Sequence, residues 1–165
     1  MTVNAQDTLD RLIRAAKAAG ADAADALIVE GVSAGVSCRL GKVEDVERAE
    51  SSNLGLRVFV GARVAFVSSS DVSARGLAEL PERAVAMARL APEDKFAGLA
   101  PRELLAKSIP DLDIEDAHEP PADALVDRAR AVEAAAMSVK GITNSEGGSA
   151  SYGRSGIALA TSEGF

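Results

Sequence analysis

Residues 53–71 constrain the fold of this chain more than any other stretch. Two apolar runs are separated by Gly61 and Ala62, and a serine-rich end follows them. A glycine in the first position of a two-residue turn is typical of a β-hairpin. The alternating positions of the first run form a uniformly apolar face: Leu54, Leu56, Val58 and Val60. The stretch therefore predicts two antiparallel strands followed by a helix capped by Ser70 or Asp71.

Apolar residues at helical spacing predict three helices, over residues 5–19, 72–90 and 122–139. Pro81 falls inside the second helix and predicts a kink there or a division into two short helices. For the first helix, the candidate caps and stop are Asn4 or Asp7 and Gly20. The stripes expected to be buried are Leu77, Leu80, Ala84, Met87 and Ala88 in the second helix, and Leu125, Ala129, Val132 and Ala136 in the third.

The remaining regular structure is predicted to be strand. Residues 23–32 and 33–40 are expected to form two neighbouring strands, because β-branched residues and alternation dominate them and Gly31 can interrupt them. A turn at residues 41–42 leads into a charged strand over 43–49, which is expected to lie at a sheet edge or to face solvent. The tail from Ile142 predicts one or two more strands. The proline-rich connector over residues 96–121, before the third helix, is expected to hold a short helix near residues 101–107.

These elements predict an α+β fold, with a largely antiparallel sheet and about three main helices packed on one face. At 165 residues the chain is long enough for a single domain over residues 1–165 that buries its own core. Phe59, Phe66 and Phe96 are expected to be its bulky members. Because residues 156–161 form an apolar strand with no partner after them, we expect residues beyond 165 to complete the sheet of a longer protein.

Charge and composition exclude several functions. The formal net charge is −7 and the sequence pI is about 4.8, which argues against direct binding of nucleic acid, since phosphate contacts need clustered lysine and arginine. A single cysteine, Cys38, cannot form an intrachain disulfide and indicates no oxidising compartment. Without a leader-like start or a membrane-length apolar run, the expected location is the cytoplasm, with no membrane partner.

The motifs for chemistry are weak. Residues 148–155 have the glycine spacing of a phosphate-binding loop, but Arg154 stands where lysine belongs and a strand follows, so a turn between strands is the favoured interpretation. His118 lies in the connector and Cys38 in a strand, which is too few ligands for a transition-metal site. The acidic run Asp111, Asp113, Glu115, Asp116 and Glu119 lacks calcium-loop spacing.

Two polar clusters, residues 68–70 and 143–146, are expected to cap neighbouring elements rather than to line a cleft. The sheet edges at residues 43–49 or 157–161 could accept an extended peptide by strand addition. From the residues alone, no catalytic, cofactor-binding or metal-binding residue is predicted in this chain.

Several segments resemble the N-terminal region of the TldD/PmbA family, whose PmbA or TldE members were first called modulators of DNA gyrase. They are residues 51–61 with 67–71, and residues 143–147 followed by 153–155 and 158–162. The segments 83–89 and 91–94 resemble the PmbA/TldE-like branch in particular.

The resemblance implies an intracellular zinc-dependent peptidase that processes or degrades unfolded peptides, built from a TldD-like catalytic subunit and a PmbA-like partner. The family's zinc motif, His-Glu-x-x-x-His, is absent from this sequence, so zinc is implied for the TldD-like subunit and no site residue is carried over. The expected role is a non-catalytic N-terminal domain, with a TldD-like subunit or a second copy as partner. The alternative is a regulatory binding module, associated with gyrase or an antitoxin-like protein and without proteolytic activity.

Overall fold

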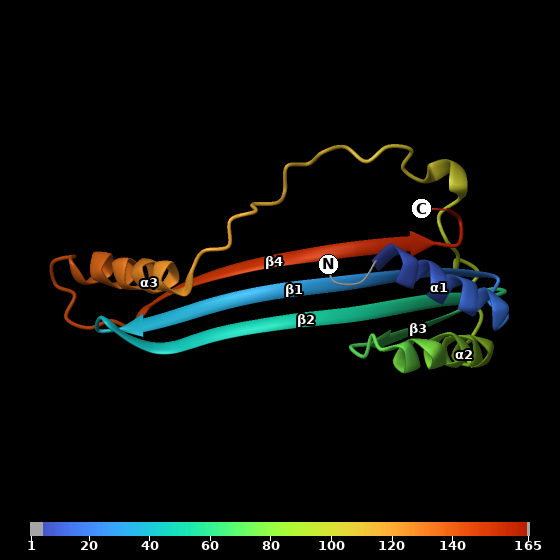
Figure 1. Ribbon diagram of the computed structural model, residues 1–165, viewed down its shortest axis with the longest axis horizontal. Coiled ribbons are helices and arrows are strands. Elements are labelled where there is room, and N and C mark those ends of the chain that lie inside the picture. The colour runs from blue at the N-terminus through green and yellow to red at the C-terminus, as the bar shows by residue number, and fades with distance from the viewer. Residues whose placement is uncertain (1–4, 165) are drawn as a thin grey trace. The chain divides into compact units, whose positions relative to one another are not determined.

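The structure is a computed structural model that describes residues 5–164. It has an α+β fold with one four-stranded antiparallel sheet, in the order β3-β2-β1-β4 (Figure 1). The elements in chain order are α1 (Ala5–Ala18), β1 (Ala23–Arg39), β2 (Lys42–Val60), β3 (Arg63–Ser69), α2 (Ala74–Leu90), the 3-10 helix η1 (Arg102–Leu104), α3 (Ala122–Met137) and β4 (Gly148–Thr161). The predicted fold class is confirmed.

The strands are longer and fewer than predicted. Residues 23–39 form one strand, β1, because Gly31 keeps an extended conformation inside it. Residues 42–60 likewise form one strand, β2, where a charged strand and a separate hairpin arm were expected. Ile142 lies in the loop before β4, and β4 is the one strand that the described part of the tail contributes. Strand length follows the hydrogen bonds made with neighbouring strands, which local sequence does not encode.

Two tight turns connect the first three strands. The β2–β3 turn lies at Gly61 and Ala62 as predicted, with Val60 paired to Arg63 and a φ of 58° at Gly61. The β1–β2 turn lies at Leu40 and Gly41, one residue before the predicted position. Both of its residues have positive φ, 49° and 74°, which is the backbone of a type I′ hairpin turn. A leucine is uncommon in this conformation.

The chain divides into two compact units. Unit 1 comprises the described parts of residues 1–30, 51–111 and 156–165, and unit 2 comprises residues 31–50 and 112–155. Each unit has its own cluster of buried apolar side chains.

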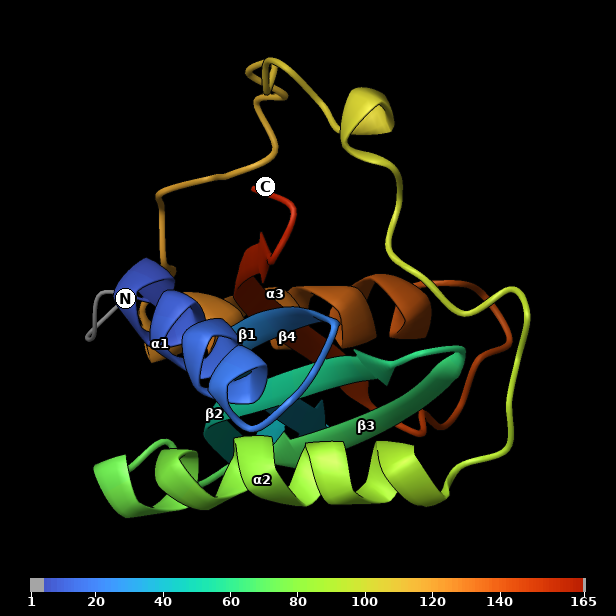
Figure 2. The ribbon, with the colours of Figure 1, turned by 90° about the vertical axis from the view of Figure 1, so that its right-hand side faces the viewer.

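In unit 1, α1 packs against α2 and α2 packs against β3 (Figure 2). The buried face of β2 is the predicted one, with Leu54, Leu56 and Val58 almost fully buried. The helices add the apolar side chains Leu9, Leu12, Ile13, Ala16, Leu80, Ala84, Val85 and Ala88.

For three residues of unit 1 the prediction of burial in the core is wrong. Phe59 is buried as expected, but Phe66 is 65% exposed and Phe96 is 83% exposed. Phe66 lies directly opposite Arg57 in the β2–β3 pair, and therefore on the face of the hairpin away from Leu56 and Val58. Met87 of α2 is also exposed, at 47%.

The start of α2 differs from the prediction. Ser73 is the N-cap, with its Oγ accepting a hydrogen bond from the Gly76 backbone N–H at 3.2 Å. Asp71 lies outside the helix, where its carboxylate accepts from the Ser73 N–H at 2.9 Å. Pro81 is buried inside α2, which continues as one helix, so of the two predicted alternatives the division into two short helices does not occur. For α1, Gly20 has a φ of 105°, and the candidate cap Asn4 lies outside the described residues.

Unit 2 has a small core between α3 and the strands. Val36, Cys38, Leu125 and Ala129 are buried there, with Tyr152 partly buried against them. The predicted stripe of α3 is correct in its first half only. Val132 is 56% exposed and Ala136 is exposed, whereas Glu133 is 3% exposed. The buried positions 125, 129 and 133 recur every four residues, so a carboxylate completes the stripe.

Candidate functional site

The most organised polar site of unit 2 is a clamp on the β1–β2 turn, made by Glu133 and Arg130 of α3 with Leu40 and Gly41. Glu133 Oε1 accepts from the Leu40 N–H at 2.7 Å, and Oε2 accepts from the Gly41 N–H at 2.9 Å. Arg130 Nε donates to the Gly41 carbonyl at 3.2 Å. The two exposed N–H groups of a type I′ turn therefore meet one carboxylate. We call this the turn clamp.

The surroundings of the Glu133 carboxylate favour its ionised form. The hydrogen bonds from Gly41 and then from Leu40 hold the pKa of Glu133 below its ordinary value, with smaller contributions from the Ser145 hydroxyl and the positive charge of Arg39. Because both carboxylate oxygens are occupied by backbone donors, the group is poorly placed to take a proton from a substrate. Its chemistry is that of a structural anion.

The loop before β4 fits closely beside the turn clamp. Arg39 Nε donates to the Ser145 carbonyl at 3.2 Å, and Ser145 Oγ accepts from the Gly147 N–H at 2.8 Å. A Cβ on Gly147 would lie 2.6 Å from the Cys38 carbonyl oxygen, and one on Gly148 would lie 2.3 Å from the Ala129 carbonyl oxygen. Both glycines are therefore required by close backbone contact.

In unit 1, the hairpin carries a second charged group outside the apolar core. Arg57 Nε lies 2.9 Å from Asp25 Oδ1, and its Nη2 makes a further ion pair with the same carboxylate. The guanidinium lies 5.2 Å from the ring centre of Phe59 and 5.6 Å from that of Phe66. The hydrogen bond to Asp25 raises the pKa of Arg57. Such a pair, with the guanidinium within reach of both rings, ties β1 to β2 and β3.

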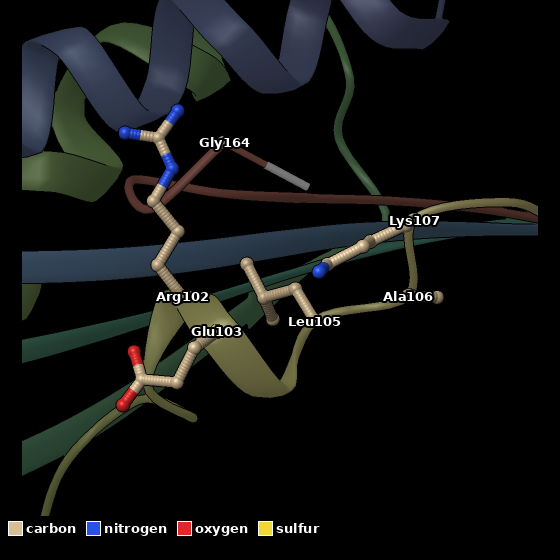
Figure 3. Close-up of a pocket in the computed structure, with 6 residues that line it drawn as sticks. All are labelled: Arg102, Glu103, Leu105, Ala106, Lys107 and Gly164. Atoms are coloured by element: carbon tan, nitrogen blue, oxygen red, sulfur yellow. The ribbon is translucent and has the colours of Figure 1, made fainter.

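A surface hollow of about 530 Å³ lies in unit 1, between η1 and the end of β4 (Figure 3). Its charged lining residues are Arg102, Glu103 and Lys107, and Arg102 extends toward Gly164 while Glu103 points away from it. All three side chains are exposed. Nothing in this arrangement selects a ligand.

The residues considered for chemistry do not come together. Residues 148–155 lie within the single strand β4, so they do not open a helix as a phosphate-binding loop would, and the predicted turn between strands is wrong as well. Cys38 is 1% exposed in the core of unit 2, whereas His118 is exposed in the connector, with its backbone N–H bonded to Asp116. Ser69 and Ser145 accept hydrogen bonds from nearby backbone N–H groups, as turn-forming residues do.

A catalytic zinc ion does not fit the residues present. Within residues 5–164, no three His, Cys, Asp or Glu side chains are placed to hold a metal ion. The sequence has one histidine and one cysteine, whereas catalytic zinc sites use three protein ligands. No helix among the described residues is long and apolar enough to cross a membrane.

Sequence reasoning missed the turn clamp and the Arg57–Asp25 pair. Each had a signal. Glu133 continues the four-residue spacing of Leu125 and Ala129, and Asp25 interrupts an apolar strand. The described residues thus have an α+β fold in which Glu133 stabilises the β1–β2 turn and the Arg57–Asp25 ion pair joins β2 to β1.

Comparison with known proteins places this domain in a family. Residues 24–88 match the family model described as PmbA/TldA metallopeptidase domain 1. The metalloprotease PmbA of Escherichia coli O157:H7 is 39% identical over 129 residues, which are 78% of this chain and 29% of that protein. A metalloprotease PmbA homolog from Haemophilus influenzae is 34% identical over 139 residues, covering 83% of this chain and 30% of that protein. The chain belongs to the PmbA/TldD family.

Solved structures share the fold. A protein described as a modulator of DNA gyrase from Bacteroides thetaiotaomicron matches with a TM-score of 0.90 and 21% identity, over 100% of this chain and 38% of that one. TldE from Thermococcus kodakarensis matches with a TM-score of 0.78 and 17% identity, over 95% of this chain and 35% of that one. This chain spans less than a third of the two PmbA relatives.

Proposed function

We propose that this chain is the non-catalytic N-terminal domain of a PmbA/TldE-like subunit of a cytoplasmic, zinc-dependent peptidase that processes or degrades unfolded peptides. In this proposal a TldD-like partner holds the zinc ion. Residues 1–165 act together as one supporting domain, which shapes the path to the peptidase chamber and helps to hold the subunits together. Residues beyond 165 complete the sheet.

One observation carries the proposal. Residues 24–88 match metallopeptidase domain 1, but the chain has a single histidine and a single cysteine. His118 is exposed in the connector, and Cys38 is buried in the core of unit 2. The organised charges support it, since Glu133 and Arg57 are engaged with backbone amides and with Asp25. Such groups stabilise a scaffold and leave the reaction to residues elsewhere.

The test uses the natural polypeptide that carries these residues. It is purified alone, with a TldD-like partner, and with that partner after treatment with a zinc chelator, and hydrolysis of an unfolded peptide is followed. We expect cleavage only by the pair, and its loss after chelation. Chelator-insensitive cleavage by the polypeptide alone would contradict the assignment.

The second candidate is a regulatory binding module without proteolysis. It is favoured by the description of a structural neighbour as a modulator of DNA gyrase, although that likeness is one of fold. The two candidates differ in one outcome. A polypeptide that binds gyrase or an antitoxin-like protein, and yields no cleavage with any TldD-like partner, is the binding module.

A further inference from the structure

About half of β2 lacks a neighbouring strand on one side. β3 pairs with β2 only from Leu54, opposite Ser69, to Val60, opposite Arg63. β1 lies on the other side of β2. In the part of the chain that the structure describes, residues 42–50 of β2 therefore present an edge without a strand partner (Figure 1). All nine of these residues are exposed. We call this stretch the free edge.

An exposed strand edge is a template for pairing, and proteins commonly protect it with charges. The free edge is charged, but its charges follow an unusual order. One face of the strand carries a basic, an acidic, an apolar, a basic and an acidic residue: Lys42, Glu44, Val46, Arg48 and Glu50. Read in the opposite direction, this order has an acidic group wherever the first has a basic one. The face is therefore complementary to an antiparallel copy of itself.

An antiparallel pair centred on Val46 places Lys42 opposite Glu50 and Glu44 opposite Arg48, each twice by symmetry, with Val46 opposite its own copy. Opposite charges directly across a strand pair are stabilising, and like charges are destabilising. Moving the centre by one residue in either direction brings like charges together: Lys42 meets Arg48 in one case, and Glu44 meets Glu50 in the other. Among residue-centred registers, the charges select Val46.

The other face of the free edge is less favourable. In the same register Val43 lies opposite Ala49, an apolar pair, but Asp45 lies opposite Glu47. This acidic cluster opposes pairing, so its neutralisation should strengthen association. The charges on the first face thus favour association of two copies, whereas those on the second face oppose it.

Arg48 is already oriented on its face. Its Nη1 donates to Glu119 at 2.6 Å and its Nη2 to Glu50 at 3.3 Å, while the side chain remains 51% exposed. A guanidinium has five N–H donors, so donors remain for an acid across the edge.

We propose that the free edge joins two copies of this chain, antiparallel about a twofold axis at Val46, so that the sheets of the two copies become continuous. The second copy is chosen over other occupants because the charge order of the edge complements itself. The readout is association, so its result is independent of whether the proposed peptidase role is correct.

A cysteine scan of the natural polypeptide tests the register. Val46→Cys places two thiols across the axis, within the Cα separation that a disulfide spans. Val43→Cys is the matched control, because its thiols would lie about 20 Å apart along the strands at ~3.4 Å per residue. The native Cys38 is 1% exposed and remains in both variants. With oxidised glutathione, we expect a crosslinked dimer from Val46→Cys and none from Val43→Cys or the wild type.

Charge exchange tests the pairing itself. By analytical ultracentrifugation, we expect Glu44→Arg to raise the dimer dissociation constant at least tenfold, and the double variant Glu44→Arg with Arg48→Glu to restore it. Asp45→Asn with Glu47→Gln should lower it. Glu82→Arg, an exposed position of α2 with the same change in charge, is the matched control and should leave it unchanged.

Three results would overturn the proposal. They are a wild type that stays monomeric at every concentration, equal crosslinking of the two cysteine variants, and an association that the charge exchanges do not change. Binding of an extended basic peptide to the edge of a monomeric chain would assign the free edge to a different occupant.

Discussion

Glu133 joins α3 to the β1–β2 turn through a carboxylate rather than through an apolar side chain. The turn needs such a partner, because Leu40 has a φ of 49° and the two turn amides point away from the strands. A non-glycine residue in this region carries a cost in backbone strain. The turn clamp offsets that cost by satisfying both amides.

Removal of the clamp should therefore destabilise the protein. We expect Glu133→Ala to lower the free energy of unfolding by about 2 kcal/mol, since hydrogen bonds to a charged group contribute about 1.5–3 kcal/mol. Urea denaturation measures this change. The control is Asp127→Ala, an exposed position on the same helix, which should change the free energy by less than about 0.5 kcal/mol. Equal effects of the two variants would contradict the role of Glu133.

The turn clamp also predicts a pH dependence. Because the pKa of Glu133 is lowered in the folded state from its ordinary 4.5, its stabilisation is complete above about pH 4.5 and is lost as the pH falls through the folded pKa. The difference in unfolding free energy between the wild type and Glu133→Gln should thus be largest near neutral pH and shrink below pH 4.5. A difference independent of pH would show that the charge contributes nothing.

At the scale of elements, α3 and β4 meet where only glycine fits. Gly148 approaches the Ala129 carbonyl so closely that an added Cβ would lie 2.3 Å from it. Gly156, in the same strand, has no atom within 4 Å of the position of a Cβ. The same substitution at these two positions should therefore have different effects.

We expect Gly148→Ala to lower the midpoint of thermal unfolding by several degrees, because helix and strand must separate to admit the methyl group, a change of about 1–3 kcal/mol. Gly156→Ala should leave the midpoint within about one degree or raise it. Circular dichroism during heating measures both. The close contact would be disproved by a Gly148→Ala variant as stable as the wild type.

The elements that local pattern determines could be predicted. The turn at Gly61 and Ala62 follows from a glycine between alternating runs, and the three helices follow from apolar spacing. The lengths of β1 and β2 could not be predicted, since they depend on hydrogen bonds with other strands. The exposure of Phe66 could have been read from the turn, which fixes its place opposite Arg57.

The partners of Glu133 in the turn clamp could not be predicted from the sequence, although its four-residue spacing from Ala129 placed it on the buried stripe of α3. A glutamate in a helix is ordinarily exposed. The burial of Glu133 depends on the Leu40–Gly41 turn, and Gly41 lies 92 residues from Glu133 along the chain. Likewise the partner of Asp25 is Arg57, in the next strand. Polar pairs of this kind are specified by tertiary contact rather than by periodicity.

At the scale of the whole molecule, the chain is a PmbA/TldD-family domain that spans less than a third of its PmbA relatives. Its organised charges hold strands and a turn, and its exposed β2 edge has the charge order of a self-pairing strand. These features support the proposed role of this chain, in which it stabilises an assembly and the reaction takes place on residues outside it.

The most direct test of that central claim is the peptidase activity of the natural polypeptide paired with a TldD-like partner, measured before and after His118→Ala and Cys38→Ala are introduced together. These are the chain's only histidine and only cysteine. The account predicts that the double variant keeps chelator-sensitive hydrolysis of an unfolded peptide, because neither side chain would touch the reacting atoms. Loss of hydrolysis in a variant that remains folded and paired would contradict it.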